Sequence, residues 1–435
     1  MRRLIFGLVA LALAVNLFIG ARIYTASAAT TPKDSAYSNL ELFTVVLERV
    51  RKEYVEGTNL TYQKLVYGAL KGMVNTLDPH SEFLDPEEYK ELQSDTEGNF
   101  GGLGIVVGMR DDWVTVIEPM EDSPGLKAGI SAGDRIVKIE GQSTEKMALP
   151  DAVKQLRGEA GTKVSLTIYR PSDKTTKDFT LMRAIIKVDT VKDIDNKKEF
   201  PLGPDKIGYI RILQFGDKTS DELEDALKKL KSQGMEGLVL DLRWNPGGLL
   251  DQAVEVCSKF LPHGEPVVST EGRNVAENYS RRADGHDELK GAPIVIIANI
   301  GSASAAEIVT GCLQDLHRAA VLGEKTFGKG SVQSVINLDD GSALKLTTAR
   351  YYTPSHKVIH EHGITPDVPV TLSDQEEHDI SVRRTPGGLE SLDDKERARV
   401  ESDRDPQLDR ATDLLKALLI YTKHASASGK MASRE

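Results

Sequence analysis

The chain has 435 residues, 40% of them hydrophobic, which is enough to form two or three domains with separate cores and disfavours a single small binding module. It carries 66 acidic against 55 basic residues, and its basic residues do not cluster with aromatic ones, so no nucleic-acid partner is predicted. Its two cysteines, Cys257 and Cys312, stand in apolar helical patterns. This favours buried thiols over a disulfide framework or a cysteine-rich metal site, and we predict no metal ion or other cofactor.

The N-terminus has the features of an export signal. Arg2 and Arg3 precede an apolar run from Leu4 to Ile19, and the small residues at 26–28 offer a cleavage site. Residues 1–28 are therefore interpreted as a signal peptide or, if they are not cleaved, as an N-terminal membrane anchor. Both interpretations place the rest of the chain in the periplasm or cell envelope, in the second case held at the inner membrane.

Residues 36–98 carry apolar side chains at helical spacing. Leu42, Val45, Val46 and Val50 illustrate the pattern. Nothing in this stretch has catalytic spacing. We expect a helical N-terminal region that packs on the rest of the chain or forms a homodimer.

Residues 99–186 change to short alternating strands, with a helix at 151–156. The run Gly101-Gly102-Leu103-Gly104-Ile105 stands just before a strand, and its amides are suited to form a nest for a carboxylate. With the segment 123–130 and the turn at 133–134, this stretch resembles a PDZ domain of the circularly permuted bacterial kind. The resemblance implies that a peptide's terminal carboxylate binds around Gly102 to Gly104, that its backbone extends the sheet, and that its last side chain meets Leu103, Ile105 and Val153. The alternative is a glycine turn that only connects two strands.

Residues 187–372 alternate strands and helices, as in an α/β core, where ligand sites collect at the points where strands end and helices begin. At the first such point, strand 237–242 runs into Arg243-Trp244-Asn245-Pro246-Gly247-Gly248. The glycine amides are suited to stabilise an oxyanion, although both glycines also serve simply to permit the turn. At the second point, small residues surround Ser304, which leaves the clearance that a nucleophile needs.

Ser304 also has a structural interpretation, because Ser304-Ala305-Ala306-Glu307 satisfies the capping-box pattern of an ordinary helix start. Lys329 favours catalysis, since it stands between two glycines ahead of a strand. The segment 323–329 also approaches a phosphate loop. That interpretation fails because Gly330 replaces the magnesium-binding Ser or Thr and because residues 331–336 alternate like a strand.

Together these motifs make the chain, as far as about Val370, similar to the carboxyl-terminal processing (tail-specific) serine protease family. The resemblance implies that Ser304 is the nucleophile, that Lys329 is the general base and that Gln333 orients the lysine. It places Gly247 and the amide of Ala305 at the oxyanion hole and gives Glu307 and Asp315 supporting, structural positions. The family commonly has a second serine where Ala306 stands and an asparagine or similar residue where Trp244 stands, and the second difference bears on the shape of the substrate cleft.

The implied fold class is α/β multidomain: a crotonase/ClpP-like α/β protease core at 187–372, an inserted permuted PDZ domain at 99–186 and the helical N-terminal region at 36–98. The implied substrates are protein or peptide C-termini of envelope proteins, cleaved for processing, signalling or degradation. Two other functions stay open at this point. One is a non-catalytic PDZ chaperone or adaptor, and the other is a crotonase-like acyl-thioester enzyme, whose family has a related core and paired oxyanion amides.

A lysine acts as a base only when neutral, so burial must lower the pKa of Lys329 if it is to activate a serine. The chain has nine histidines, but none stands in a comparable arrangement, which makes a Ser-His-Asp triad the less favoured mechanism.

Two further segments carry expectations. Arg157, at the end of the PDZ helix, either pairs with an acidic group of the core and gates the site or is a solvated helix end. Residues 373–435 are expected to form a charged, solvated connection followed by a helix from Asp405 to Tyr421 that docks or dimerises.

Overall fold

The computed structural model describes residues 36–56, 60–120, 122–285, 287–385, 387–389 and 392–432. The chain divides into two units, residues 1–83 and 84–435, which are described separately. The predicted export signal at 1–28 lies outside the described residues.

The first unit contains the helices α2 (Ala36–Glu53) and α3 (Tyr62–Val74). Thr61 caps the start of α3, where its side chain accepts the N–H of Lys64. Helix α2 has no buried residue, and Leu42, Val45, Val46 and Val50 are exposed on it. In the part of the chain that the structure describes, no helix is both long enough and apolar enough to cross a membrane.

The second unit begins with α4 (Pro86–Glu97), which Asp85 caps through a complete capping box. A two-stranded sheet follows, formed by β2 (Asn99–Gly102) and β9 (Ala184–Lys187). Between these strands lies a mixed domain whose sheet has the order β3-β4-β5-β7-β8, with β6 paired to β5. Its elements are β3 (Ile105–Arg110), β4 (Trp113–Pro119), α5 (Pro124–Lys127), β5 (Arg135–Ile139), β6 (Gln142–Ser143), α6 (Leu149–Leu156), β7 (Lys163–Arg170) and β8 (Thr175–Met182).

The α/β core is built on a six-stranded sheet of order β10-β11-β12-β15-β16-β19. All neighbouring strands are parallel except the pair β10 and β11. The strands are β10 (Val191–Lys192), β11 (Ile207–Ile212), β12 (Gly237–Asp241), β15 (Ile294–Ala298), β16 (Ala320–Gly323) and β19 (Val368–Pro369). Every residue of β12 and β15 is buried, which explains why the sequence shows them as continuous apolar runs.

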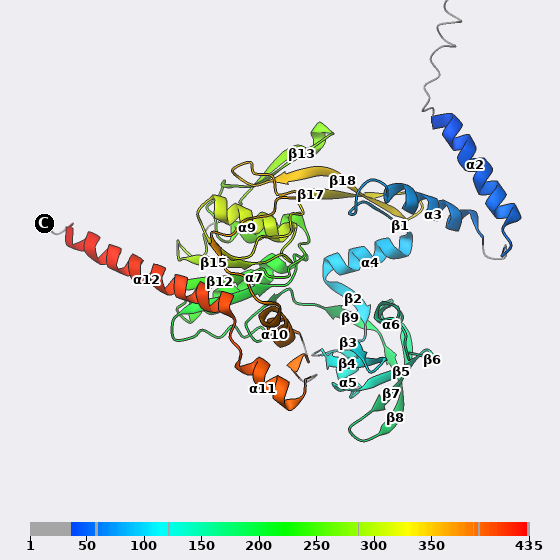
Figure 1. Cartoon of the computed structure of the whole chain (residues 1–435), viewed down its shortest axis with the longest axis horizontal. Helices are drawn as coiled ribbons and strands as arrows, with labels where there is room; N and C mark the ends of the chain where they lie inside the picture. The colour runs from blue at the N-terminus through cyan, green and yellow to red at the C-terminus, as the bar shows by residue number, and fades with distance from the viewer. Residues whose placement is uncertain are drawn as a thin grey trace, which may run out of the picture. The chain divides into compact units, whose positions relative to one another are not determined.

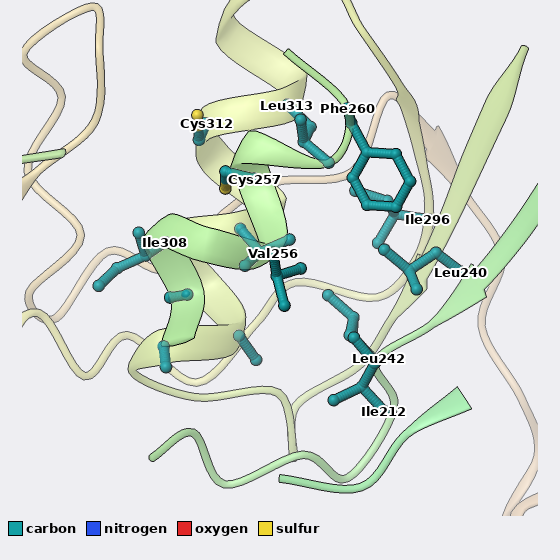
Figure 2. Close-up of a cluster of buried hydrophobic side chains, with 14 of the residues drawn as sticks. Ile212, Leu240, Leu242, Val256, Cys257, Phe260, Ile296, Ile308, Cys312 and Leu313 are labelled. Atoms are coloured by element: carbon teal, nitrogen blue, oxygen red, sulfur yellow. The ribbon is translucent and has the colours of Figure 1, made fainter. Parts of the chain in front are cut away.

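Helices α7 (Thr219–Ser232), α8 (Leu250–Ser258) and α9 (Ala305–Asp315) pack on one face of this sheet. Figure 2 shows part of this core, to which Leu240 and Ile296 of the sheet, Val256 of α8 and Ile308 of α9 all contribute buried side chains. Cys257 and Cys312 are fully buried free thiols on these two helices, which confirms the prediction from their apolar surroundings. Along the strands of this sheet, every second side chain faces the opposite side, as Val239 does between Leu238 and Leu240. These side chains contact α12 (Pro406–Ala432).

A second sheet of the core contains β13 (Pro266–Gly272), β14 (Tyr279–Arg282), β17 (Ser331–Asn337) and β18 (Ala343–Tyr352). Strands β17 and β18 form an antiparallel hairpin (Figure 1). The register of this hairpin is irregular between Val332 and Gln333. Such irregularities change the direction in which side chains point and are frequent beside active sites.

The expected solvated connection after residue 372 has to be corrected. Helices α10 (Asp374–Arg384) and α11 (Asp394–Ser402) occupy most of it. Asp379 is 1% exposed and pairs with Arg399. The charges in this stretch therefore stabilise contacts between helices and with the core, whereas a charge-rich sequence alone suggested hydration. Helix α12 begins one residue after the expected Asp405.

Candidate active site

Ser304 lies at the turn between β15 and α9. It is 8% exposed, and the small side chains of Ala303, Ala305 and Ala306 around it are buried. Its backbone has φ 55° and ψ −116°, a conformation that side-chain-bearing residues rarely adopt. A strained strand-to-helix turn of this kind presents a nucleophile at the end of a sheet.

Glu307, three residues further on, is fully buried and joins this turn to the lysine segment. Its carboxylate accepts the N–H of Ser304 at 2.9 Å, the N–H of Gly328 at 2.7 Å and the N–H of Lys329 at 2.8 Å. The hydroxyl of Thr326 donates to the same group at 2.5 Å. Burial raises the pKa of Glu307, while these hydrogen bonds oppose the rise. The capping-box pattern at Ser304 is thus part of a larger arrangement that fixes two turns.

The Pro-Gly-Gly turn approaches Ser304 closely. Gly247 and Gly248 have φ of 101° and 143°, which favours glycine at both positions. A Cβ atom on Gly247 would lie 2.7 Å from Cβ of Ser304 and 3.0 Å from N of Ala305. The turn therefore requires glycine both for its conformation and for its close approach to Ser304.

The two amides predicted for the oxyanion hole are in different situations. Ala305 opens α9, where helix amides lack an intrahelical partner. The N–H of Gly247 instead donates to Oδ1 of Asn245 at 2.9 Å. In this conformation the Gly247 amide is occupied, so it serves an oxyanion only after the Asn245 side chain releases it.

Hydrogen bonds connect the glycine turn to the serine turn directly. The N–H of Ala303 donates to the carbonyl of Asn245 at 2.9 Å. The hydroxyl of Ser302 donates to the carbonyl of Leu242 at 2.8 Å, and Oδ1 of Asn299 accepts the N–H of Trp244 at 2.9 Å. These linking contacts were not predicted from the sequence, although polar residues in a buried segment at the end of a strand are a signal that could have revealed them.

Lys329 is half-buried in the segment before β17. Burial lowers the pKa of its amine, and the positive charge of Lys345 on the neighbouring strand lowers it further, while Glu307 opposes both. This is the direction that a lysine base requires. Lys345 was not identified from the sequence, because it becomes a neighbour only through the β17–β18 pairing of Val335 with Lys345.

Gln333 does not bond to Lys329 in the structure. Its amide group donates to Oγ of Ser331 at 2.9 Å and to the carbonyl of Ser331 at 3.2 Å. The irregular register between Val332 and Gln333 accompanies this orientation. The structure thus brings Gln333 to the same cavity as Lys329 but shows no contact that orients the amine.

A cavity of about 820 Å³ contains these groups. Ser304, Lys329, Gln333 and Gly247 line it, together with Lys345. Apolar side chains from α4, from the start of α8 and from β17 also line it: Leu92, Leu249, Leu250, Val332 and Val335. No described histidine lines the cavity, which disfavours a triad at this place.

The predicted peptide-binding loop lies at the edge of the smaller domain. Strand β3 is the terminal strand of its sheet, with β4 on one side, and α6 packs against it. The carbonyls of Leu103 and Gly104 accept the N–H groups of Gly125 and Met120, which fixes the loop before β3. Gly101 passes the backbone of Gly158 so closely that a Cβ atom would collide with it.

Two other predicted positions lie away from the cavity. Asp315 is at the far end of α9 from Ser304, where it pairs with Lys357 at 2.6 Å and accepts from Ser355. Arg157 pairs with Asp95 of α4 at 2.8 Å, so its acidic partner lies on this helix, whereas the gating alternative placed that partner on the α/β core. Asp95 itself lines the cavity.

Comparison with known proteins identifies the family of the chain. Residues 206–370 match peptidase family S41, and residues 91–169 match the PDZ domain. The chain is 43% identical over 373 residues to a carboxy-terminal-processing protease of Bartonella bacilliformis, covering 85% of this chain and 82% of that protein. It is 42% identical over 308 residues to a probable CtpA-like serine protease of Staphylococcus aureus, covering 71% of this chain and 60% of that protein.

A solved structure of a photosystem II D1 C-terminal processing protease is 30% identical, with coverage of 80% of this chain and 97% of that one and a TM-score of 0.44. Given the extent of the match to the Bartonella protein, the chain belongs to peptidase family S41 and is a carboxy-terminal-processing serine protease with a PDZ domain. This membership sets aside the non-catalytic adaptor and the acyl-thioester enzyme.

Proposed function

We propose that the protein cleaves peptide bonds with a dyad of Ser304 and Lys329. The observation that carries the proposal is that both residues line one cavity, with the pKa of the amine lowered by burial and by Lys345. A neutral amine accepts the proton of a serine hydroxyl, which an ordinary protonated lysine cannot do.

In the proposed reaction, Oγ of Ser304 attacks the carbonyl carbon of the scissile bond while its proton passes to Nζ of Lys329. The N–H of Ala305, and that of Gly247 once Asn245 releases it, stabilise the negative oxygen. The C–N bond then breaks, and the leaving amine takes the proton from Lys329, which leaves an acyl group on Ser304. The neutral lysine then takes a proton from water, whose oxygen attacks the ester carbonyl. The ester C–O bond breaks, and the lysine returns the proton to Oγ of Ser304.

The glycine loop is proposed to select substrates by their C-termini. The terminal carboxylate binds the amides around Gly102 to Gly104, and the peptide adds a strand to the open edge of β3. Its last side chain meets Leu103, Ile105 and Val153. Amidating the C-terminus of a peptide substrate should weaken binding and slow cleavage, and equal values for the free and amidated peptides would contradict the carboxylate contact.

The dyad is tested by incubating the enzyme with an unstructured protein. Ser304→Ala and Lys329→Ala should each reduce the rate by at least about 10³-fold while the variants still bind a C-terminal peptide. Gln333→Ala should have a smaller effect, because it does not transfer a proton. If a histidine proves indispensable, or if Lys329→Ala retains most activity, the dyad is wrong.

We also propose a cellular location, an oligomeric state and a fold class for the protein. The protein is exported to the periplasm or cell envelope by residues 1–28, cleaved or retained as an anchor, and acts there on C-terminal regions of envelope proteins in processing, signalling or degradation. The exposed apolar residues of α2 support a homodimer. The parallel strands with helices on both faces support a crotonase/ClpP-like core, and the insertion between β2 and β9 supports a permuted PDZ domain.

A further inference from the structure

We infer that Asp405, in the C-terminal segment, is a positioning residue for the glycine turn at the nucleophile and acts through Arg243. The inference rests on the proposed function, in which that turn stabilises the oxyanion. It assigns residues 373–432 a role in catalysis that their charge-rich sequence does not suggest.

Arg243 connects the C-terminal segment with the catalytic core. It is 1% exposed, and its guanidinium forms two hydrogen bonds with Asp405, Nη1 to Oδ1 at 3.0 Å and Nη2 to Oδ2 at 2.8 Å. Nη1 also donates to Oε1 of Gln407 at 3.0 Å, while Nε and Nη2 donate to Asp241. The planar guanidinium is thus held on two sides, by the end of β12 and by the start of α12, and its geometry allows few other orientations.

The C-terminal segment also supplies an arginine, Arg384, which binds the carboxylate of Asp241. Nη2 of Arg384, at the end of α10, donates to Oδ2 of Asp241 at 2.6 Å, beside the hydroxyl of Tyr209 at 2.8 Å. Burial alone would raise the pKa of Asp241, but Arg243 and Arg384 outweigh it and hold the pKa well below its usual range. Asp241 is therefore ionised, and removing Asp405 would leave one carboxylate facing two buried guanidinium groups.

Trp244 shows why this turn needs support. It has φ 56°, which is unfavourable for a bulky side chain, so the surrounding contacts must hold it there. Its N–H donates to Asn299, and its indole Nε1 donates to Glu377 of α10 at 3.2 Å. The guanidinium groups of Arg243 and Arg384 lie 5.6 Å and 5.3 Å from the ring. The C-terminal segment thus contacts the strained residue itself.

The path from these contacts to the reacting atoms is short. Asn245 follows Trp244 and binds both the Gly247 amide and the backbone of Ala303, next to Ser304. Arg243 stands four residues before Gly247. A shift of the turn therefore moves the Gly247 amide relative to Ser304, and misplacement by about 1 Å can reduce a catalytic rate by about 10²-fold.

Asp405→Asn separates the positioning of Arg243 from a second role of Asp405, the capping of a helix. Asp405 is also the N-cap of α12, where its Oδ1 accepts the N–H of Leu408 at 3.1 Å, and Asn is an equally good N-cap. The variant should lower kcat by about 10- to 100-fold with little change in KM, because the oxyanion contact exists only in the transition state. Asp405→Glu, which keeps the charge, should recover part of the loss.

Lys416→Gln is the matched control. Lys416 lies on the same helix and also pairs with the core, through Asp205 at 2.8 Å, but at the exposed surface. Its loss should leave kcat unchanged.

Fluorescence provides a readout independent of catalysis. The chain has two tryptophans, so in a Trp113→Phe background the emission reports on Trp244 alone. Asp405→Asn should shift this emission, and Lys416→Gln should not. If the Asn variant fails to bind a C-terminal peptide or unfolds at the assay temperature, Asp405→Glu replaces it as the decisive variant, since it keeps the charge and displaces the carboxylate that binds Arg243.

A folded variant with kcat within about twofold of the wild type and unchanged emission would overturn the inference. Activity that survives in Ser304→Ala would instead overturn the proposed function. The emission change does not depend on which residue is the nucleophile, so the two failures are distinguishable.

Discussion

Ser304 and Lys329 share one hydrogen-bond acceptor: Oε2 of Glu307 receives the backbone N–H of Ser304 at 2.9 Å and that of Lys329 at 2.8 Å. The two residues are far apart in the sequence, and a single buried oxygen fixes the position of one backbone relative to the other.

Glu307→Gln should therefore impair catalysis without removing a reacting group. The glutamine amide offers one acceptor and two donors where four donors converge, so at least one buried N–H or O–H loses its partner. We expect kcat to fall by about 10²-fold and the free energy of unfolding to fall by about 1–3 kcal/mol, measured by peptidase kinetics and urea unfolding. Unchanged kcat would show that the dyad aligns without this shared acceptor.

The pH dependence follows from the lowered pKa of Lys329. The amine is active when neutral, so the kcat/KM of the free enzyme should be low at acidic pH and rise as pH increases through the lowered pKa. Lys329→Arg keeps the charge but cannot lose its proton, so it should be folded and inactive over the whole range. Lys325→Arg, at an exposed lysine four residues earlier, is the control and should retain the wild-type profile.

Lys345 should influence the same profile from the adjacent strand. Its positive charge disfavours protonation of Lys329, so Lys345→Met should raise the pKa of the base. The ascending limb of kcat/KM against pH should move to higher pH, with reduced activity near neutrality that recovers in alkaline solution. Lys325→Met should not move the limb, and an unmoved limb in Lys345→Met would mean that burial alone tunes the base.

Arg157 and Asp95 connect the PDZ helix to the wall of the cavity. Arg157 also lies 4.4 Å from the ring of Phe100. If this contact gates the site, Arg157→Ala should change kcat while leaving the affinity of the PDZ domain for a peptide intact. Lys154→Ala is the matched control. Lys154 pairs with Glu87, which is also on α4 but does not line the cavity. Equal kinetics for the two variants would favour the solvated helix end.

The strained backbone of Ser304 predicts an unusual order of stability. With φ 55° and ψ −116°, glycine fits this position better than any residue with a Cβ atom. Ser304→Gly should be more stable than Ser304→Ala by about 1 kcal/mol, although both are inactive. Denaturant unfolding of the two variants measures the difference. A more stable alanine variant would show that the turn relaxes when the hydroxyl is removed.

The sequence by itself determined the family and marked the candidate reactive residues. The glycine run before β3, the Pro-Gly-Gly turn, Ser304 and Lys329 are local features, because glycines and small residues mark the places where a backbone must turn or approach closely. The same holds for the buried strands and for the two buried cysteines, since their apolar periodicity is visible without knowing their neighbours.

Only the tertiary structure decided which groups meet. The pairing of β17 with β18 brings Lys345 close to Lys329, and the fold of the C-terminal segment brings Asp405 to Arg243, 162 positions away in the sequence. The tertiary structure also decides that the side-chain amide of Gln333 bonds to Ser331 and that the N–H of Gly247 donates to Asn245. Charges and amides have no periodicity that reveals their partners. Their hydrogen bonds depend on side-chain orientation and on strand register, which are set when distant segments pack together.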